Sequence, residues 1–366
     1  MVGTTPFFGF KTFSAVFGFQ LSRLRRGFGG QATFNYTQWL VLEVGADKPG
    51  DISSLATWLR PDVAVITRFA EVPVHSEFFP SVSALFREKS ALAHSVKDGG
   101  LLILGSDDRE VAALSEVARE RRVVCFGTTE RAQVRGSHYT ARYGTDGLPE
   151  GITFRVQVGG TSLPLSVSGV LGAHQMQPFL AALAVCFGEG LNLVQAAARF
   201  SLYKPLRGRM RLLRGINSSL IIDDSYNSSP VALAEALSAL GSFEMSGRKI
   251  AVLGDMRELG EQAAEEHRKG GTLAASSCAL LYTVGALAAG FAEGALKAGM
   301  APQNIMQCRD SSEAGEKIAG LVRQGDAVLI KGSQAVRMER AVKKLLAEPA
   351  RAAELLVRQE KEWERR

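Results

Sequence analysis

Short, largely apolar runs recur along the first third of the chain, and segments of mixed polarity separate them. Runs of about four to eight such residues are typical of strands that are buried on both faces of a parallel sheet. The predicted strands are WLVLEVGA (39–46), VAVIT (63–67), LLILG (101–105) and RVVCFG (122–127). Residues 80–96 instead place apolar side chains at helical spacing, with charged side chains between them. This region therefore predicts alternating strands and helices.

The pattern changes near residue 150. From 151 to 158 every second side chain is apolar, and the pair Gly159–Gly160 follows. Strict alternation that ends in paired glycines predicts an antiparallel hairpin over residues 151–169. Residues 176–190 are nearly all apolar, so we expect a buried helix there.

A second strand and helix series follows YKPLRGRM (203–210), whose proline and glycine mark a linker. The predicted strands are SLIIDD, KIAVLGDM, LLYTVG, NIMQC and AVLIKGS, with helices such as SSEAGEKIAGLVRQ between them. Such alternation predicts a doubly wound parallel sheet. We therefore predict an α/β protein with one parallel-sheet domain over 1–204 and a Rossmann-like α/β domain over 205–346. Residues 347–366 are a charged helix or a frayed end.

Composition adds little to this pattern. The 366 residues carry a formal charge of +6, but the basic side chains are scattered, so we expect no nucleic-acid partner. The four cysteines are far apart and have no CxxC spacing, which favours reduced thiols in a cytoplasmic protein. The phenylalanine-rich segment 7–28 has neither the layout of a signal peptide nor the uninterrupted length of a membrane span. We expect it to be a helix with an apolar face.

Three predicted strands of the second series end in polar residues. They are followed or ended by DDSYN (223–227), GDM (254–256) and KGS (331–333). Ligands of open α/β sheets bind outside the carboxyl ends of the strands, so we expect the three ends to share one cleft. Asp, Asn, Ser and Gly also favour turns, and ordinary turn chemistry is the alternative interpretation of each motif taken singly.

Several of these stretches resemble the Mur ligases. They are VLEVGADKPGDI (41–52), VPVHSEFF (72–79), FREKSAL (86–92), GVLGAHQMQPFLAALAV (169–185), RGRM (207–210), IIDDSYNSSPVAL (221–233), AVLGDMRELG (251–260) with His267 beyond it, and GDAVLIKGSQAVRME (325–339). The resemblance covers roughly residues 39–346. Within the family it is strongest to the branch that adds D-alanyl-D-alanine to a UDP-MurNAc-tripeptide, because the DDSYN and LGDMRELG pair is specific to that branch.

The resemblance implies an ATP-dependent ligase of peptidoglycan precursor synthesis, and so of cell-wall biogenesis, cell shape and cell division. Such enzymes phosphorylate a peptide carboxylate with ATP, and an amine then attacks the acyl phosphate to give an amide, ADP and phosphate. The implied partners are ATP, Mg²⁺, the UDP-MurNAc-peptide and D-Ala-D-Ala. A cytoplasmic monomer is implied as well.

The family also implies a magnesium site that includes a carbamylated lysine. Glu43, at the end of a predicted buried strand, fits a hard oxygen ligand of Mg²⁺. His75 fits the family's histidine ligand, and Lys89 follows it at the family's spacing to the lysine that becomes carbamylated. A loop histidine and a solvated helix lysine are the simpler interpretations of these two residues taken alone. Their order and spacing favour the metal site.

The remaining site residues also come from the resemblance. His174 and Gln175 are expected near the adenine or ribose, and Arg209 at the phosphates across the interdomain cleft. Asp224 is expected at the ribose, with Tyr226 and Asn227 beside the base. The remaining candidates lie on the acceptor side of the cleft: Lys331 and Ser333 near the incoming amine or the transferred phosphate, and Asp255 and Glu258 near the dipeptide.

One element of the family pattern is missing from this sequence. The GTTPFFGFKTF stretch (3–13) contains Gly9, Lys11 and Thr12, but an extra residue breaks the GxxxxGK[ST] spacing of a phosphate-binding loop. Smaller departures occur at Arg68, Gly105, Pro178 and Gln334. Two explanations remain: a truncated reading frame of a ligase, or a reduced, non-catalytic binding or scaffold homologue. In either case we expect the chain alone to turn over ATP poorly.

Overall fold

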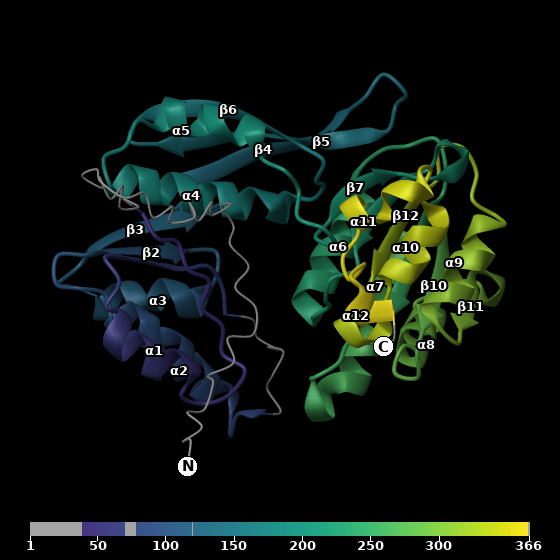
Figure 1. Ribbon diagram of the computed structural model, residues 1–366, viewed down its shortest axis with the longest axis horizontal. Coiled ribbons are helices and arrows are strands. Elements are labelled where there is room, and N and C mark those ends of the chain that lie inside the picture. The colour runs from purple at the N-terminus through teal and green to yellow at the C-terminus, as the bar shows by residue number, and fades with distance from the viewer. Residues whose placement is uncertain (1–38, 70–77, 119, 365–366) are drawn as a thin grey trace, which may run out of the picture.

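The computed structural model describes residues 39–69, 78–118 and 120–364, and places two six-stranded sheets in two lobes (Figure 1). The elements of the first lobe are α1 (Asp51–Leu59), β1 (Val63–Ile66), α2 (Val82–His94), β2 (Leu101–Gly105), α3 (Arg109–Val117), β3 (Arg122–Gly127), β4 (Val134–Tyr143), β5 (Pro149–Val158), β6 (Thr161–Ser168), η2 (Ala173–Met176), α4 (Gln177–Gly188), α5 (Leu193–Arg199) and η3 (Phe200–Leu202).

The elements of the second lobe are β7 (Arg211–Arg214), η4 (Ile216–Ser218), β8 (Leu220–Asp224), α6 (Pro230–Ser242), β9 (Lys249–Gly254), η5 (Gly260–Gln262), α7 (Ala263–Ser277), β10 (Leu280–Val284), α8 (Ala289–Lys297), η6 (Pro302–Asn304), β11 (Ile305–Cys308), α9 (Ser311–Ala319), β12 (Ala327–Lys331), η7 (Gln334–Val336), α10 (Glu339–Leu345), η8 (Pro349–Arg351), α11 (Ala352–Leu355) and α12 (Lys361–Glu364). In the part of the chain described, no helix is long and apolar enough to cross a membrane.

The first sheet is parallel at one side and antiparallel at the other. Its order is β1-β2-β3-β4-β5-β6, with parallel pairing from β1 to β4 and antiparallel pairing from β4 to β6. The predicted strands at 63–67, 101–105 and 122–127 and the predicted hairpin are confirmed. The predicted helices over 80–96 and 176–190 are confirmed as α2 and α4.

The strand predicted over 39–46 is wrong. These residues form no strand, and Trp39, Leu40 and Val41 are exposed. A parallel strand needs a neighbour to complete its backbone hydrogen bonds, and the only neighbour of β1 in the described sheet is β2. Glu43 therefore does not lie at the end of a buried strand but in an exposed stretch without regular structure.

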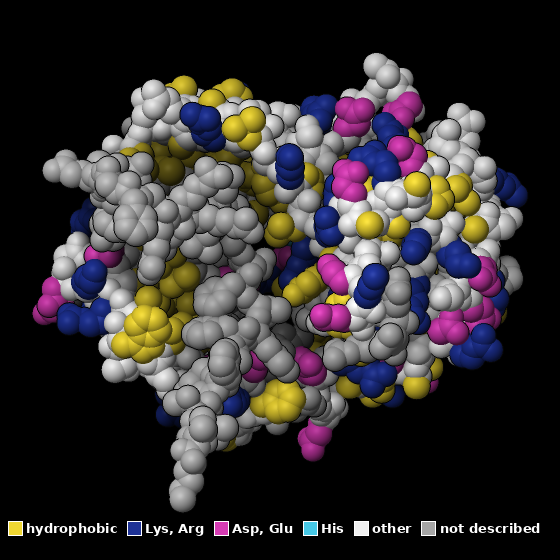
Figure 2. All heavy atoms as spheres, in the orientation of Figure 1, with side chains coloured by type: hydrophobic (Ala, Val, Ile, Leu, Met, Phe, Trp, Pro, Cys, Tyr) yellow, Lys and Arg dark blue, Asp and Glu magenta, His cyan; other side chains and the backbone are white. Residues whose placement is uncertain are grey.

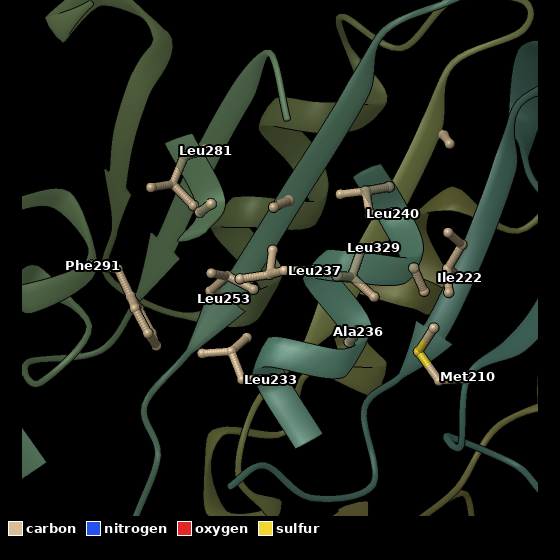
Figure 3. Close-up of a cluster of buried hydrophobic side chains, with 14 of the residues drawn as sticks. Met210, Ile222, Leu233, Ala236, Leu237, Leu240, Leu253, Leu281, Phe291 and Leu329 are labelled. Carbon is tan, nitrogen blue, oxygen red and sulfur yellow. The ribbon is translucent and has the colours of Figure 1, made fainter. Parts of the chain in front are cut away.

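The second sheet has the order β11-β10-β9-β12-β8-β7 and is parallel except for the edge strand β7. Helices cover both of its faces, as a doubly wound fold requires. On one face α6 packs Leu233, Leu237 and Leu240 onto side chains of the strands, and α8 adds Phe291 (Figure 3). On the other face α9, α10 and α11 cover a second buried cluster. The two-domain α/β prediction is confirmed at the level of fold.

The two lobes also share apolar packing. Leu148, at the turn between β4 and β5, and Leu171 belong to the same buried cluster as the core of α6. The β4–β5 hairpin reaches from its own sheet to the second lobe (Figure 1). Polar contacts accompany this packing: Arg214 pairs with Asp146, and the Glu244 N–H donates to the Tyr143 hydroxyl at 3.0 Å.

Candidate functional site

Strands β8 and β12 lie side by side in the second sheet, but the chain leaves them in opposite directions. After β8 it enters α6, which packs on one face, and after β12 it enters α10, which packs on the other. Ligands of open α/β sheets bind outside the carboxyl ends of two such strands, because no connection covers this position, here called the crevice. The polar strand ends predicted from the sequence lie at this position.

Asp224 and Lys331 face each other across this boundary. They are register partners at the ends of β8 and β12, and the Lys331 Nζ lies 2.6 Å from an Asp224 carboxylate oxygen. The other carboxylate oxygen accepts the Met210 N–H at 3.1 Å, and Nζ also donates to the Asn227 carbonyl at 3.1 Å. Both side chains are almost fully buried. A carboxylate has about four lone-pair sites, so Asp224 retains acceptor capacity for a ligand hydroxyl.

Asp223 points to the other face of the strand and has no cationic partner of this kind. Its two oxygens accept the N–H groups of Gly208, at 3.1 Å, and Ser225, at 3.2 Å. Complete burial nevertheless raises the pKa of Asp223 to about 6, against the opposing effect of these hydrogen bonds. Asp223 therefore fastens the 208 loop to the end of β8, and the adjacent Asp224 is left for the crevice.

Arg209 and Tyr226 form a stacked pair at the surface of the crevice. The guanidinium carbon lies 4.1 Å from the centre of the ring, and the Tyr226 N–H donates to the Gly208 carbonyl at 3.0 Å. Gly208 has a φ of 66°, and a Cβ there would lie 2.8 Å from the Tyr226 nitrogen. Only glycine allows this approach of the two loops. The stack presents an aromatic ring and an exposed cation together, which fits a nucleotide.

The third strand end joins the same constellation. The Ser333 N–H donates to the Asp255 carbonyl at 3.0 Å, and the Ser333 hydroxyl accepts the Arg257 N–H at 2.8 Å. The prediction that the three strand ends lie together is confirmed by these contacts and by the Asp224–Lys331 pair. Glu258 is half-buried in a left-handed conformation, with a φ of 66°.

The side chains of Asp255 and His267 make hydrogen bonds that hold the backbone of neighbouring segments in place. The Asp255 carboxylate accepts the Ala288 N–H at 2.8 Å and lies 3.1 Å from the Arg257 guanidinium. His267 accepts the Met256 N–H at Nε2 and donates from Nδ1 to the Ala263 carbonyl, which fixes the neutral tautomer. Burial lowers the pKa of His267, so the ring stays uncharged.

The first lobe contributes His174 and Gln175 at η2, where the chain approaches the second lobe. The two side chains are half-buried and lie 3.0 Å apart, and a Cβ on Gly172 would touch Ala239 of α6. Burial lowers the pKa of His174, and the charges of Glu235 and Asp224 act in the opposite direction. His174 is thus close enough to Asp224 and Glu235 for their charges to affect its pKa.

Lys89 lies in the middle of α2 and is half-buried. Desolvation lowers its pKa, so a larger fraction of its amine is neutral than for an exposed lysine. A neutral amine is the form that adds CO₂, so Lys89 fits a carbamate. His75 lies outside the described residues, and Glu43 is exposed. Within the described ranges, no three His, Cys, Asp or Glu side chains cluster as a metal site.

Sequence reasoning missed two groups near the crevice. Arg68 pairs with Glu235 of α6 and so connects the lobes beside His174. Arg358, from the segment interpreted as a charged helix or frayed end, donates to the carbonyls of Ser225 and Tyr226. Both contacts join segments that are far apart in the sequence, so no local pattern indicates them. The tail that contains Arg358 shows only a high content of charged residues.

Comparison with known proteins identifies the class. Residues 30–186 match the Mur ligase middle domain, and residues 208–334 match the glutamate ligase domain of Mur ligases. These two matches cover most of the chain, which belongs to the Mur ligase family.

The relatives narrow the resemblance to one branch. The chain is 28% identical over 321 residues to the UDP-N-acetylmuramoyl-tripeptide–D-alanyl-D-alanine ligase of Bacillus subtilis, a match that covers 86% of this chain and 65% of that protein. It is 30% identical over 335 residues to the enzyme of the same name from Mycobacterium leprae, covering 82% of this chain and 62% of that one. The chain thus spans less than two thirds of the length of these curated relatives.

A solved structure agrees with this result. The MurF ligase of Thermotoga maritima in complex with ADP superposes with a TM-score of 0.68 at 26% identity, over 82% of this chain and 65% of that one. The predicted family is confirmed, and so is the prediction that the chain is most similar to the branch that adds D-alanyl-D-alanine. The individual roles of the site residues remain predictions.

Proposed function

We propose that this chain is the nucleotide-binding and amide-forming part of a ligase that adds D-Ala-D-Ala to a UDP-MurNAc-tripeptide in peptidoglycan synthesis. The observation that carries the proposal is the convergence of Asp224, Asn227 and Lys331 at the boundary between β8 and β12, beside the Arg209–Tyr226 stack. An acid, a buried cation and an exposed arginine around an aromatic ring fit a nucleotide phosphoanhydride. The family and the ADP-bound relative support ATP as that nucleotide.

In this proposal the second lobe binds one end of ATP. Tyr226 and Asn227 contact the base, the Asp224 carboxylate accepts a ribose hydroxyl, and Arg209 neutralises phosphate oxygens. His174 and Gln175 approach the adenine or ribose from the first lobe. Because the Lys331 ammonium and the Ser333 hydroxyl both lie at the carboxyl end of β12, they are placed to act on the transferred phosphate or the incoming amine. Asp255 and Glu258 border the dipeptide.

Lys89 is proposed to act as its carbamate, whose oxygens together with Glu43 and His75 would hold Mg²⁺. The bound Mg²⁺ would supply charge neutralisation for the phosphates. What the chain itself supplies is a desolvated amine on a rigid helix, with no hydrogen bond or ion pair to another described residue. A lysine without such a partner is free to take up CO₂. Reduced thiols at all four cysteines fit the proposed cytoplasmic location, and we propose a monomer.

Carbamylation is the sharpest test of this proposal. The chain is placed in ¹³C-bicarbonate at mildly alkaline pH, and carbon NMR is used to look for a protein carbamate. We expect one carbamate resonance, lost in Lys89→Ala and retained in Lys97→Ala. Lys97 is a matched control because it follows the same helix but is exposed and paired with Asp62. A parent chain without the resonance, or a Lys89→Ala variant that keeps it, would contradict the assignment.

The reaction is tested by mass spectrometry after incubation with ATP, Mg²⁺, UDP-MurNAc-tripeptide and D-Ala-D-Ala. Each amide formed must consume one ATP and release one ADP and one phosphate. We expect product from this chain near background, since its sequence contains no GxxxxGK[ST] loop to grip the phosphates. ADP binding, measured by titration calorimetry, therefore decides between the proposed site and a chain without nucleotide function. A chain that does not bind ADP would contradict the proposal.

A further inference from the structure

Residues 352–363, here called the C-terminal strap, run across the two loops that form the candidate nucleotide site. The guanidinium of Arg211 donates to the Leu355 carbonyl at 3.1 Å, and that of Arg207 donates to the Leu356 carbonyl at 3.4 Å. Leu355 and Leu356 are themselves buried in the cluster beneath α10. The strap is therefore fastened to the 207–211 loop on one side and to the core on the other.

Arg358 fastens the strap to the second loop. Its guanidinium donates to the Ser225 carbonyl at 2.6 Å and to the Tyr226 carbonyl at 3.2 Å, while Nε donates to Glu339 at 3.1 Å. The side chain is only 5% exposed, and the Glu339 side chain is 1% exposed. Burying two charges is costly unless their hydrogen bonds are made, and here both groups are well supplied with partners.

The backbone at Arg358 also indicates a site held under constraint. Its φ is 55°, in the left-handed region that a residue with a Cβ rarely adopts. Such a conformation persists only where the surroundings determine it. The contacts to Ser225, Tyr226 and Glu339 hold Arg358 in this conformation, so the strap is docked in one defined position.

The two carbonyls that Arg358 binds immediately precede Asn227, whose own carbonyl accepts a hydrogen bond from Lys331. Arg209 stacks on the Tyr226 ring, and the Arg358 guanidinium carbon lies 5.9 Å from the centre of the same ring. Arg358 thus fixes the peptide groups from which Tyr226 and Asn227 project.

We infer that Arg358 is a positioning residue of the nucleotide site: it holds the 225–227 loop so that Tyr226 and Asn227 meet the base. This inference rests on the proposed nucleotide function. The planar guanidinium has five N–H donors and serves two carbonyls and a carboxylate at once. A lysine ammonium replaces the charge beside Glu339 but not this fork.

The test compares the parent chain with Arg358→Ala, Arg358→Lys and Arg351→Ala. Arg351 is the matched control because it immediately precedes the strap but is exposed, and its ion pairs within the described ranges are with Glu348 and Glu354. Each chain is measured in three ways: thermal unfolding, amide hydrogen exchange of residues 208–210 and 225–227, and ADP affinity by titration calorimetry. Hydrogen exchange needs no nucleotide, so it reports on the loop even if ADP fails to bind.

In Arg358→Ala we expect about tenfold faster exchange in the two loops and about tenfold weaker ADP binding, as for loss of charged hydrogen bonds. Arg358→Lys should recover most of the melting temperature but not the ADP affinity. Arg351→Ala should match the parent in every measurement. A merely structural role would make affinity follow the melting temperature.

Three outcomes would overturn the inference. They are unchanged loop exchange in Arg358→Ala, faster exchange without weaker ADP binding, and full recovery of ADP affinity in Arg358→Lys. If the parent chain binds no ADP, the proposed function fails instead. Loop exchange then still decides whether Arg358 holds the loop.

Discussion

Asp223 and Asp224 are neighbours in the chain but lie in different electrostatic surroundings. Asp224 meets the Lys331 ammonium, whereas Asp223 is fully buried and accepts the backbone N–H groups of Gly208 and Ser225. Because successive residues of a strand point to opposite faces, the two carboxylates meet different neighbours and have different roles. Asp223 holds a loop, and Asp224 borders the crevice.

The raised pKa of Asp223 predicts a specific pH dependence of stability. Its pKa is about 6 in the folded chain, against 3.8 for an aspartate in its ordinary, solvated state, so between these pH values the folded state binds more protons than the unfolded state. Its contribution to stability is therefore lost as pH rises through this window, by about 3 kcal/mol. Urea unfolding of the parent and of Asp223→Asn from pH 4 to 7 measures this. The difference between the two curves should fall with rising pH, and a constant difference would contradict the assignment.

Nucleotide binding tests the role of Asp224. We expect the parent to bind ADP with an affinity of high micromolar to millimolar, about −4 to −5 kcal/mol. Asp224→Ala should abolish this binding, because the ribose loses a charged acceptor. Lys89→Ala should leave it nearly unchanged, because the carbamate serves the metal and the γ-phosphate.

Asp224→Ala also strands the buried Lys331 ammonium, at a cost of about 3–5 kcal/mol. Asp326→Ala is the matched control, since the buried Asp326 carboxylate pairs with the half-buried Arg248 just before β12, at the opposite end of the strand. Both variants should lose stability, but only Asp224→Ala should lose ADP. Equal ADP affinity in the two variants would show that Asp224 is only part of a capped turn.

At the scale of elements, helices α7 and α8 pack so closely that their backbones touch. A Cβ on Gly294 of α8 would lie 2.0 Å from the Arg268 carbonyl oxygen of α7, and one on Gly271 would lie 2.0 Å from the Phe291 oxygen. Backbone atoms cannot move aside as a flexible side chain can. The glycines therefore set the distance between the two helices and, through Phe291, the seat of α8 on the sheet.

We predict that Gly294→Ala lowers the free energy of unfolding by about 1–3 kcal/mol, the usual cost of overpacking. Chemical denaturation gives this value directly. Gly320→Ala is the control, because at the end of α9 a Cβ would be no nearer than 3.6 Å to its neighbours and φ is −74°. If both substitutions have the same small effect, the helices can separate without cost and the contact is not restrictive.

Strands β8 to β12 of the second sheet could be predicted from the sequence because each is a largely apolar run that ends in a turn, whereas the short edge strand β7, RLLR, was not predicted. Their polar ends followed from the same pattern, since carboxyl ends of parallel strands meet at one edge. The segment 39–46 has the same pattern but no partner strand beside it in the described sheet, so the local signal was insufficient. Strand β4 was missed because its pattern, VRGSHYTARY, is largely polar, and only pairing with β5 makes it a strand.

At the scale of the whole molecule, site residues were predictable where a motif is local and not where docking brings distant segments together. The DDSYN stretch contains its own chemistry, but nothing in RQEKEWERR indicates that Arg358 lies beneath it. Similarly, the Arg68–Glu235 pair joins residues of different lobes. On the face shown in Figure 2, cationic and anionic side chains are interspersed over the right-hand lobe, so charge pattern alone does not mark the site.

The linker at 203–210 should be the preferred site of proteolysis. Lys204, Leu206, Arg207 and Arg209 are exposed there, between the last helix of the first lobe and β7. We predict that limited proteolysis yields a resistant C-terminal fragment of about 150 residues, a normal domain size. Denaturing gels and mass spectrometry identify its first residue. A digest without a resistant fragment that begins near residue 205 would count against this domain boundary.

Two leucines of the first lobe, Leu148 at the turn between β4 and β5 and Leu171 after β6, give such a cut an unusual result. Leu148 and Leu171 pack in the same cluster as α6, and Arg214 pairs with Asp146, so we expect these contacts to hold the two pieces together after cleavage. The nicked protein should thus travel through a sizing column as one particle and fall into two only in denaturant. Separately produced halves should, by the same contacts, find each other and reassemble without a covalent connection.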